Sequence, residues 1–184
     1  TAGKRPAPQA ASGQLLAKVA VVGSGPAGLA AAHALAKAGA KAVIHEAEAV
    51  AGGMTAWAIP PFRLDPAALK EDLDYILSFG VELKLKSPVD GDKLAELRKE
   101  YDAVILACGA PKSTTMDLPG ADGEDVHLGL DFLKACALGT PPALKAPVLV
   151  VGGGNVAVDA ARTARRQVEG VNVVYRREAA QMPA

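Results

Sequence analysis

The sequence has only two cysteines, few aromatic residues (4%), and no excess of either charge, with 20 Lys+Arg against 20 Asp+Glu in 184 residues. Cys108 and Cys136 do not form a C-x-x-C pair, and they are too few for a zinc or iron–sulfur site. We interpret both as buried free thiols in a reducing compartment. A net charge of zero gives no indication of a nucleic-acid-binding surface.

Long apolar runs are also missing, because none reaches the ~18 residues of a membrane span. Residues 1–16 are rich in Pro, Ala and Ser and lack the charged-then-apolar order of a signal peptide, so they predict a flexible lead-in. We therefore expect a cytoplasmic protein without membrane contact.

What the sequence does contain is the alternation of β-branched runs and Ala-rich helical segments that is typical of an α/β fold with a parallel sheet. The predicted strands are 18–22, 41–46, 81–85, 102–107, 147–151 and 171–175, and the predicted helices are 26–38, 66–79, 92–100, 128–138 and 155–168. The strand 102–107 is expected to be buried. A strand–helix–strand unit occurs at 18–46 and again at 147–175, which indicates an internal repeat.

The first repeat carries a glycine motif, G-S-G-P-A-G at residues 23–28, between its first strand and its helix. Gly23 permits a tight turn, Gly25 lets a pyrophosphate approach the backbone, and Gly28 lets the helix pack closely on the strand. The helix N-terminus then offers N–H groups to phosphates. Glu46 follows Gly23 by 46−23 = 23 residues, where a carboxylate can accept hydrogen bonds from ribose hydroxyls.

A glycine pair, Gly52-Gly53, follows Glu46 after five intervening residues. This pair would bring the chain back against the cofactor without a side chain in the way. The E-x5-G-G spacing is typical of FAD-binding members of this fold and argues against a simple NAD-dependent dehydrogenase.

The second repeat carries G-G-G-N-V-A at residues 152–157, which fits G-x-G-x-x-A. Tyr175 stands at 152+23 = 175, where Glu46 stands in the first repeat, and Arg176 and Arg177 follow. Guanidinium groups can pair with a 2′-phosphate that a carboxylate would repel. The second site therefore favours NADPH over NADH, although two solvated arginines would give the same pattern.

Several longer strings resemble the glutamate synthase small-subunit family of two-dinucleotide flavoprotein oxidoreductases. They are V-A-V-V-G-S-G-P-A-G-L-A-A-A from residue 19, G-G-M from 52, I-P-P-F-R-L from 59, Y-D-A-V-I-L-A from 101, G-G-G-N-V-A-V-D-A-A-R-T-A from 152 and V-V-Y-R-R from 173. The resemblance implies hydride transfer from NADPH to FAD, then electron transfer to an iron–sulfur domain or subunit. The cofactors would perform this chemistry, so no catalytic side chain and no metal ligand is predicted.

The motifs and the resemblance together predict an FAD-binding Rossmann-like domain at 17–140 and the truncated start of an NADPH-binding Rossmann-like domain at 145–184. The residues expected to contact FAD are Gly23, Gly25, Pro26, Ala27, Gly28, Glu46, Gly52, Gly53, Met54, Gly109 and, from the resemblance alone, Arg63. Those expected to contact NADPH are Gly152, Gly154, Asn155, Val156, Arg176 and Arg177.

In the family, the chain continues well past the residue that corresponds to Ala184 and then returns to the FAD domain. A lone βαβ unit cannot cover both faces of its sheet, so we expect a partner chain or further sequence to complete the fold. The alternative hypothesis is a non-catalytic scaffold subunit, or a fragment of a larger redox complex, that keeps the nucleotide-binding fold.

Overall fold

The computed structural model describes residues 17–184, so the predicted lead-in at 1–16 lies outside the described residues. Two compact units are present: the first includes the chain up to Ala56 together with Asp65–Ala110, and the second contains Trp57–Leu64 and Pro111–Ala184. The domain boundaries drawn above stay a prediction. No helix in the described part of the chain has the length and apolar character that a membrane crossing needs.

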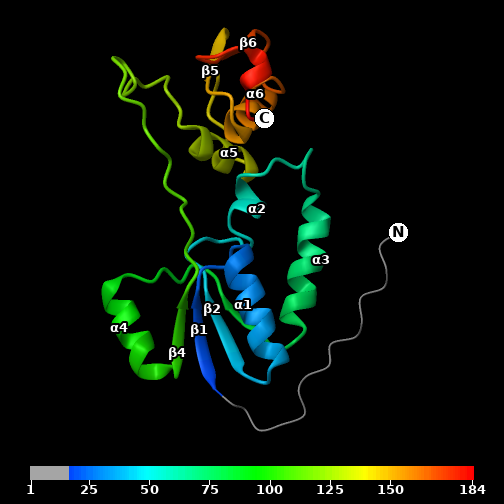
Figure 1. The fold of residues 1–184 in the computed structure, drawn as a ribbon, viewed down its shortest axis with the longest axis vertical. Helices are drawn as coiled ribbons and strands as arrows, with labels where there is room; N and C mark the ends of the chain where they lie inside the picture. The colour runs from blue at the N-terminus through cyan, green and yellow to red at the C-terminus, as the bar shows by residue number, and fades with distance from the viewer. Residues whose placement is uncertain (1–16) are drawn as a thin grey trace. The chain divides into compact units, whose positions relative to one another are not determined.

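The first unit is built on a four-stranded sheet in which every strand pair is parallel, in the order β3-β2-β1-β4. Its elements are β1 (Lys18–Val22), α1 (Pro26–Lys37), β2 (Lys41–His45), the start of α2 (Met54–Trp57), α3 (Pro66–Leu77), β3 (Glu82–Lys84), α4 (Gly91–Glu100) and β4 (Ala103–Leu106). Figure 1 shows the strands side by side, with α1 and α3 next to each other. The predicted α/β class with a parallel sheet is confirmed.

Alternating side chains of β1 enter two different cores. Val21 packs with Leu29 and Ala32 of α1, and residues of α3 join that cluster. Val22 faces the other way and packs with Leu97 of α4. Because successive strand residues point to opposite faces, the helices form two layers around the sheet.

The helix boundaries follow local signals. Pro26 occupies the first turn of α1, and Gly39 after its end has a φ of 89°, which a side chain disfavours. Asp65 caps α3, because its side chain accepts a hydrogen bond from the backbone N–H of Ala67. Both helices begin at the predicted residues, Pro26 and Pro66. The four-residue helix α2 has no periodic signature and was not predicted.

The second unit contains α5 (Gly129–Ala137), β5 (Val148–Val151), α6 (Asn155–Ala164), β6 (Val171–Val174) and a 3₁₀ turn, η1 (Ala179–Gln181). β5 and β6 pair in parallel, and α5 and α6 share a small core around Phe132, Leu133 and Ala160. α6 ends before its predicted end at Val168, because the N–H groups of Arg166 and Gln167 bond carbonyls only three residues back.

Some predicted burial is wrong. β4 lies at the edge of its sheet, and the side chain of Leu106 is 63% exposed. Cys108 follows β4 and is exposed, whereas Cys136 is half-buried. Burial raises the pKa of the Cys136 thiol, and a hydrogen bond from Gln167 opposes this effect. Both cysteines are free, as predicted, but the apolar sequence around Cys108 did not indicate its exposed position.

Candidate functional site: two glycine turns

The first glycine turn, residues 23–28, connects β1 to α1 at the carboxyl edge of the parallel sheet. The N–H of Gly23 donates to the carbonyl of His45 at 2.8 Å, which fastens the turn to the end of β2. Gly23 has a φ of 101°, and a Cβ there would lie 2.5 Å from the carbonyl oxygen of Ala107 beyond β4. A Cβ at Gly28 would overlap the carbonyl oxygen of Gly23. Both positions therefore require glycine for the fold itself.

Gly25 differs from these two glycines. A Cβ built on it meets no described atom within 4 Å, so the space in front of the turn is open. Gly25 is the N-cap of α1, and no side chain among the described residues caps this helix. The N–H groups of the first turn, including that of Ala27, are of the kind that bind phosphate oxygens at helix N-termini. The turn thus fits a pyrophosphate.

Glu46 is buried beside this turn, with 7% of its surface exposed. One carboxylate oxygen, Oε2, accepts hydrogen bonds from the backbone N–H and the hydroxyl of Ser24 at 2.8 and 2.5 Å. The other oxygen, Oε1, accepts one from the N–H of Glu48 at 2.8 Å. A carboxylate has about four acceptor positions, so these three bonds leave one for a ribose hydroxyl. The sequence reasoning missed that Glu46 also holds the turn in shape.

Ser24 is the residue that connects the parts of the first site, and it was not singled out from the sequence. It is fully buried, and besides its bonds to Glu46 it accepts the N–H of Gly52 at its carbonyl oxygen (3.1 Å) and at its hydroxyl (3.2 Å). Ser24 occupies the variable position between the first two glycines of the motif. Its small hydroxyl side chain, which can bond nearby backbone groups, is the signal that could have indicated this role.

The second glycine pair lies against the first turn. A Cβ at Gly53 would stand 2.8 Å from the Cα of Gly25, and Gly53 has a φ of 57°. Met54 begins α2 directly after this pair. Gly109, with a φ of 65°, follows β4, the strand that pairs with β1. The structure therefore gathers the predicted FAD residues of the first unit at the carboxyl edge of its sheet.

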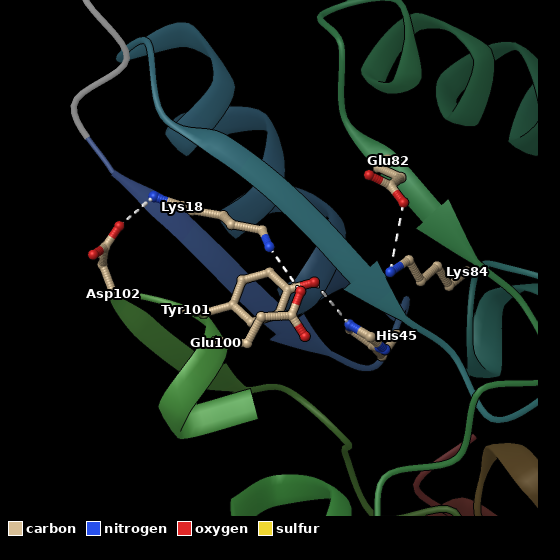
Figure 2. Close-up of polar contacts among 7 residues, drawn as sticks. All are labelled: Lys18, His45, Glu82, Lys84, Glu100, Tyr101 and Asp102. Atoms are coloured by element: carbon tan, nitrogen blue, oxygen red, sulfur yellow. Dashed lines mark hydrogen bonds and ion pairs between the residues drawn. The ribbon is translucent and has the colours of Figure 1, made fainter. Parts of the chain in front are cut away.

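His45 precedes Glu46 and is buried, with its ring beside that of Tyr101 at the end of α4 (Figure 2). Its Nδ1 lies 3.0 Å from the hydroxyl of Ser87, and its Nε2 lies 3.5 Å from the hydroxyl of Tyr101. Burial lowers the pKa of His45 below its ordinary value, and the positive charges of Lys84 and Lys93 lower it further. Glu100 and Glu82 oppose that shift.

The same face of the sheet carries a polar group at its far end (Figure 2). The ammonium of Lys18 lies 2.7 Å from a carboxylate oxygen of Glu100 and 4.2 Å from the ring centre of Tyr101, and the backbone N–H of Lys18 donates to Asp102. These contacts attach the end of α4 to the start of β1. His45 is thus held by structural contacts with Ser87 and Tyr101 directly before Glu46.

The second glycine turn, residues 152–157, repeats the first. The N–H of Gly152 donates to the carbonyl of Val174, the last residue of β6, at 2.9 Å. A Cβ at Gly154 meets no described atom within 4 Å, and within the described chain no side chain caps α6. The open glycine and the free helix N-terminus, with Asn155 and Val156 in its first turn, fit a second pyrophosphate.

The end of β6 carries the residues predicted to choose between NADPH and NADH. The ring of Tyr175 packs over Gly153, where a Cβ would meet ring atoms at 2.7 Å. Arg176 and Arg177 follow and are exposed. β6 pairs with β5 in parallel, so the arginines after β6 and the glycine turn after β5 both follow the carboxyl ends of the strands, at the same edge of the sheet. Their contact with a 2′-phosphate stays a prediction.

Arg63, predicted from the resemblance to contact FAD, belongs to the second unit, and that contact stays a prediction. Its guanidinium Nη1 donates to Oδ2 of Asp159 in α6 at 2.8 Å, within the second unit. Asp159 is buried, with 4% of its surface exposed. No group of three or more metal-ligating side chains occurs in residues 17–184.

Comparison with known proteins places this geometry in a family. The family model of the pyridine nucleotide-disulphide oxidoreductases matches residues 17–184. Among solved structures, Mycobacterium tuberculosis FprA in complex with NADPH superposes with a TM-score of 0.73 at 23% identity, covering 86% of this chain and 43% of that protein. This likeness confirms the Rossmann-like fold.

The chain is also similar to curated proteins. It is 43% identical over 177 residues to the NADPH-Fe(3+) oxidoreductase subunit beta of Geobacter sulfurreducens, covering 91% of this chain and 26% of that protein. It is 43% identical over 190 residues to the NADP(+)-dependent formate dehydrogenase subunit beta of Moorella thermoacetica, with coverage of 98% and 27%. The glutamate synthase [NADPH] small chain of Escherichia coli is 35% identical over 179 residues, with coverage of 90% and 38%.

The chain thus spans less than two-fifths of the length of these three relatives. The predicted resemblance to the glutamate synthase small subunit is confirmed by the last of them. The two glycine turns, the parallel sheets and the family match agree, and the chain belongs to the pyridine nucleotide-disulphide oxidoreductase family.

Proposed function

We propose that this chain binds FAD at its first glycine turn and NADPH at its second, as part of a flavoprotein oxidoreductase. The observation that carries the proposal is the pair of open glycines, Gly25 and Gly154, each at an uncapped helix N-terminus within the described residues. Bound together, the two cofactors would supply a hydride transfer from nicotinamide to flavin.

The residues of the first unit would hold FAD by its pyrophosphate and ribose. The N–H groups of Ala27 and Gly28 belong to the first turn of α1, which no side chain among the described residues caps, and they would donate to the phosphates where the helix dipole favours negative charge. Glu46 would use its remaining acceptor position for a ribose hydroxyl. Gly52, whose N–H donates to Ser24, and Gly53, which lies against Gly25, would close the cradle without a side chain.

The residues of the second unit would hold NADPH in the same manner. Gly154, Asn155 and Val156 form the phosphate-binding start of α6. Arg176 and Arg177 would pair with the 2′-phosphate, which NADH lacks. The choice of NADPH over NADH rests on this pair and on the absence of an acid at Tyr175.

We further propose that electrons leave the flavin for an iron–sulfur domain or subunit, and that more polypeptide completes the second unit. Two relatives carry the name subunit beta, which supports a multi-subunit enzyme. The outer residues of β5, Leu149 and Val151, are 65% and 52% exposed, as expected for a sheet that lacks a second cover. A location in the cytoplasm is part of the same proposal.

The test is anaerobic titration of the longest polypeptide that carries this sequence. We expect absorbance in the flavin bands and its bleaching by NADPH, with NADH less effective. A flavin-free protein that binds NADPH would refute the FAD assignment. Bound flavin that NADPH does not bleach, with the neighbouring subunit supplied, would favour the scaffold hypothesis over the enzyme.

A further inference from the structure

The segment Trp57–Leu64 leaves the first unit and belongs to the second. Peptide bonds join it at both ends to the first unit, at Ala56 and at Asp65. Its tip is a tight turn, because the N–H groups of Arg63 and Leu64 both donate to the carbonyl of Pro60, at 2.9 and 3.2 Å. The segment is thus a short rigid excursion.

One ion pair fastens this excursion to α6. Arg63 donates to Oδ2 of Asp159 at 2.8 Å, and the other oxygen of Asp159, Oδ1, is buried without a hydrogen-bond partner in the described structure. Arg63 is the cation that compensates this buried carboxylate. A buried charge that depends on a single partner strongly favours the conformation in which the partner is present.

Aromatic contacts add to the ion pair. Two guanidinium groups lie over the ring of Phe62: that of Arg162, in α6, at 4.3 Å from the ring centre, and that of Arg166, in the turn after α6, at 4.0 Å. The ring of Trp57 is 5% exposed and has the ammonium of Lys134 at 5.3 Å. Cations over aromatic faces attract, most strongly where water is excluded.

We propose that Trp57–Leu64 is a latch, held on α6 by Arg63 and Asp159, which positions the second unit for hydride transfer. This inference rests on the proposed function. The chain passes between the units three times, at 56/57, 64/65 and 110/111. With the latch released, residues 111–184 would be tied to the first unit only through 110/111.

The remaining connection is loose, because residues 107–128 contain neither helix nor strand. A flexible tether lowers the effective concentration of one site at the other. Hydride transfer requires reacting atoms at about 3–3.5 Å, so it is sensitive to that loss. Binding of each nucleotide within its own unit does not depend on that effective concentration. Arg63 and Asp159 are therefore positioning residues and not catalytic ones.

The first measurement is hydrogen–deuterium exchange on the longest polypeptide that carries this sequence. In Arg63→Met and Asp159→Asn, we expect the amides at 62–64 to exchange at least about tenfold faster, while β5 and α6 stay protected. Arg63→Lys keeps the charge and should restore most of the protection. Lys70→Met, which removes the exposed ion pair to Asp74, is the matched control and should change nothing at 62–64.

The second measurement is the rate of flavin reduction at saturating NADPH, together with the dissociation constant of NADP⁺. Arg63→Met and Asp159→Asn should each slow reduction by about tenfold or more and leave the dissociation constant within about threefold, and the double variant should be no slower than either. If Asp159→Asn also exposes α6, Arg63→Met decides, because its side chain is 42% exposed.

Unchanged exchange at 62–64 overturns the latch. Faster exchange with unchanged reduction overturns its positioning role, as does a loss confined to NADP⁺ affinity. If NADPH fails to reduce the flavin of the unmodified protein, the proposed function fails, whereas the exchange measurement still decides whether the latch exists.

Discussion

Replacing Gly25 by alanine separates the binding role of the first turn from its folding role. A Cβ at this position points into open space and meets no described atom within 4 Å. Its φ of −67° suits any residue. We therefore expect the fold to tolerate the change within about 0.5 kcal/mol, since glycine and alanine differ little at such positions.

FAD binding should respond very differently. The added methyl group would occupy the space through which the pyrophosphate reaches the N–H groups at the start of α1. Loss of two hydrogen bonds to a charged group, at about 1.5 kcal/mol or more each, amounts to about 3 kcal/mol. That corresponds to a dissociation constant raised by about two orders of magnitude.

Gly28→Ala is the matched comparison. Here the Cβ would overlap the carbonyl oxygen of Gly23, so the turn must distort. We expect a loss of stability of about 1–3 kcal/mol or more, as for overpacked cores. Urea unfolding of the apoprotein and FAD titration by fluorescence give the two quantities for each variant. A Gly25→Ala protein that binds FAD as tightly as the original, or that unfolds as easily as Gly28→Ala, would refute the reasoning.

Four further changes test other parts of the structure. Glu46→Gln replaces a carboxylate that accepts three hydrogen bonds by an amide with only one acceptor oxygen. Urea unfolding should therefore show a free energy of unfolding lower by about 2–4 kcal/mol. An unchanged midpoint would contradict the role of Glu46 in holding the turn. The native pKa of His45 lies below its unfolded value near 6.5, so its stabilising contribution is present above that pH and is lost as the pH falls; thermal melts of His45→Gln should show a weaker decline on the acid side. Arg176→Gln combined with Arg177→Gln should weaken NADPH about tenfold or more and leave NADH within about threefold, as measured by steady-state KM; equal losses for both would remove the 2′-phosphate role. Leu149 is 65% exposed, so Leu149→Ser should change the free energy of unfolding of the 184-residue chain by less than about 0.5 kcal/mol. In a longer polypeptide whose additional residues cover β5, the same change should be destabilising. Equal effects in the two proteins would argue against such a cover.

The first turn could be predicted from the sequence because its determinants are local. A β-branched run ending at Gly23, a proline at the first helical position and a glycine after the helix each have a backbone reason to be where they are. The parallel sheet followed from the repeated strand–helix–strand order, since such crossovers join parallel strands. The structure adds only small shifts in where these elements end.

Features that depend on distant partners were not predictable. The string P-P-F-R-L indicates a rigid loop, but nothing near Arg63 indicates that its partner is Asp159, 96 residues further on. The apolar residues at 103–106 predict a strand, yet only its place at the edge of the sheet leaves Leu106 exposed. The local sequence pattern indicates which face of a strand is apolar, whereas the tertiary structure determines which other elements cover that face.

The two glycine turns share one backbone design, although we propose a different nucleotide for each. Gly152, Gly154 and the carbonyl of Val174 occupy the same positions as Gly23, Gly25 and the carbonyl of His45, at a constant offset of 152−23 = 129 residues. The offset continues to 157 and 175, where Ala157 replaces Gly28 and Tyr175 replaces Glu46. In the first turn Glu46 holds Ser24 and supplies a negative acceptor, whereas in the second Tyr175 packs on Gly153 and leaves no carboxylate to oppose a phosphate. On the proposed function, the backbone would set the pyrophosphate site in both units, and the residue after the second strand would decide which nucleotide suits it.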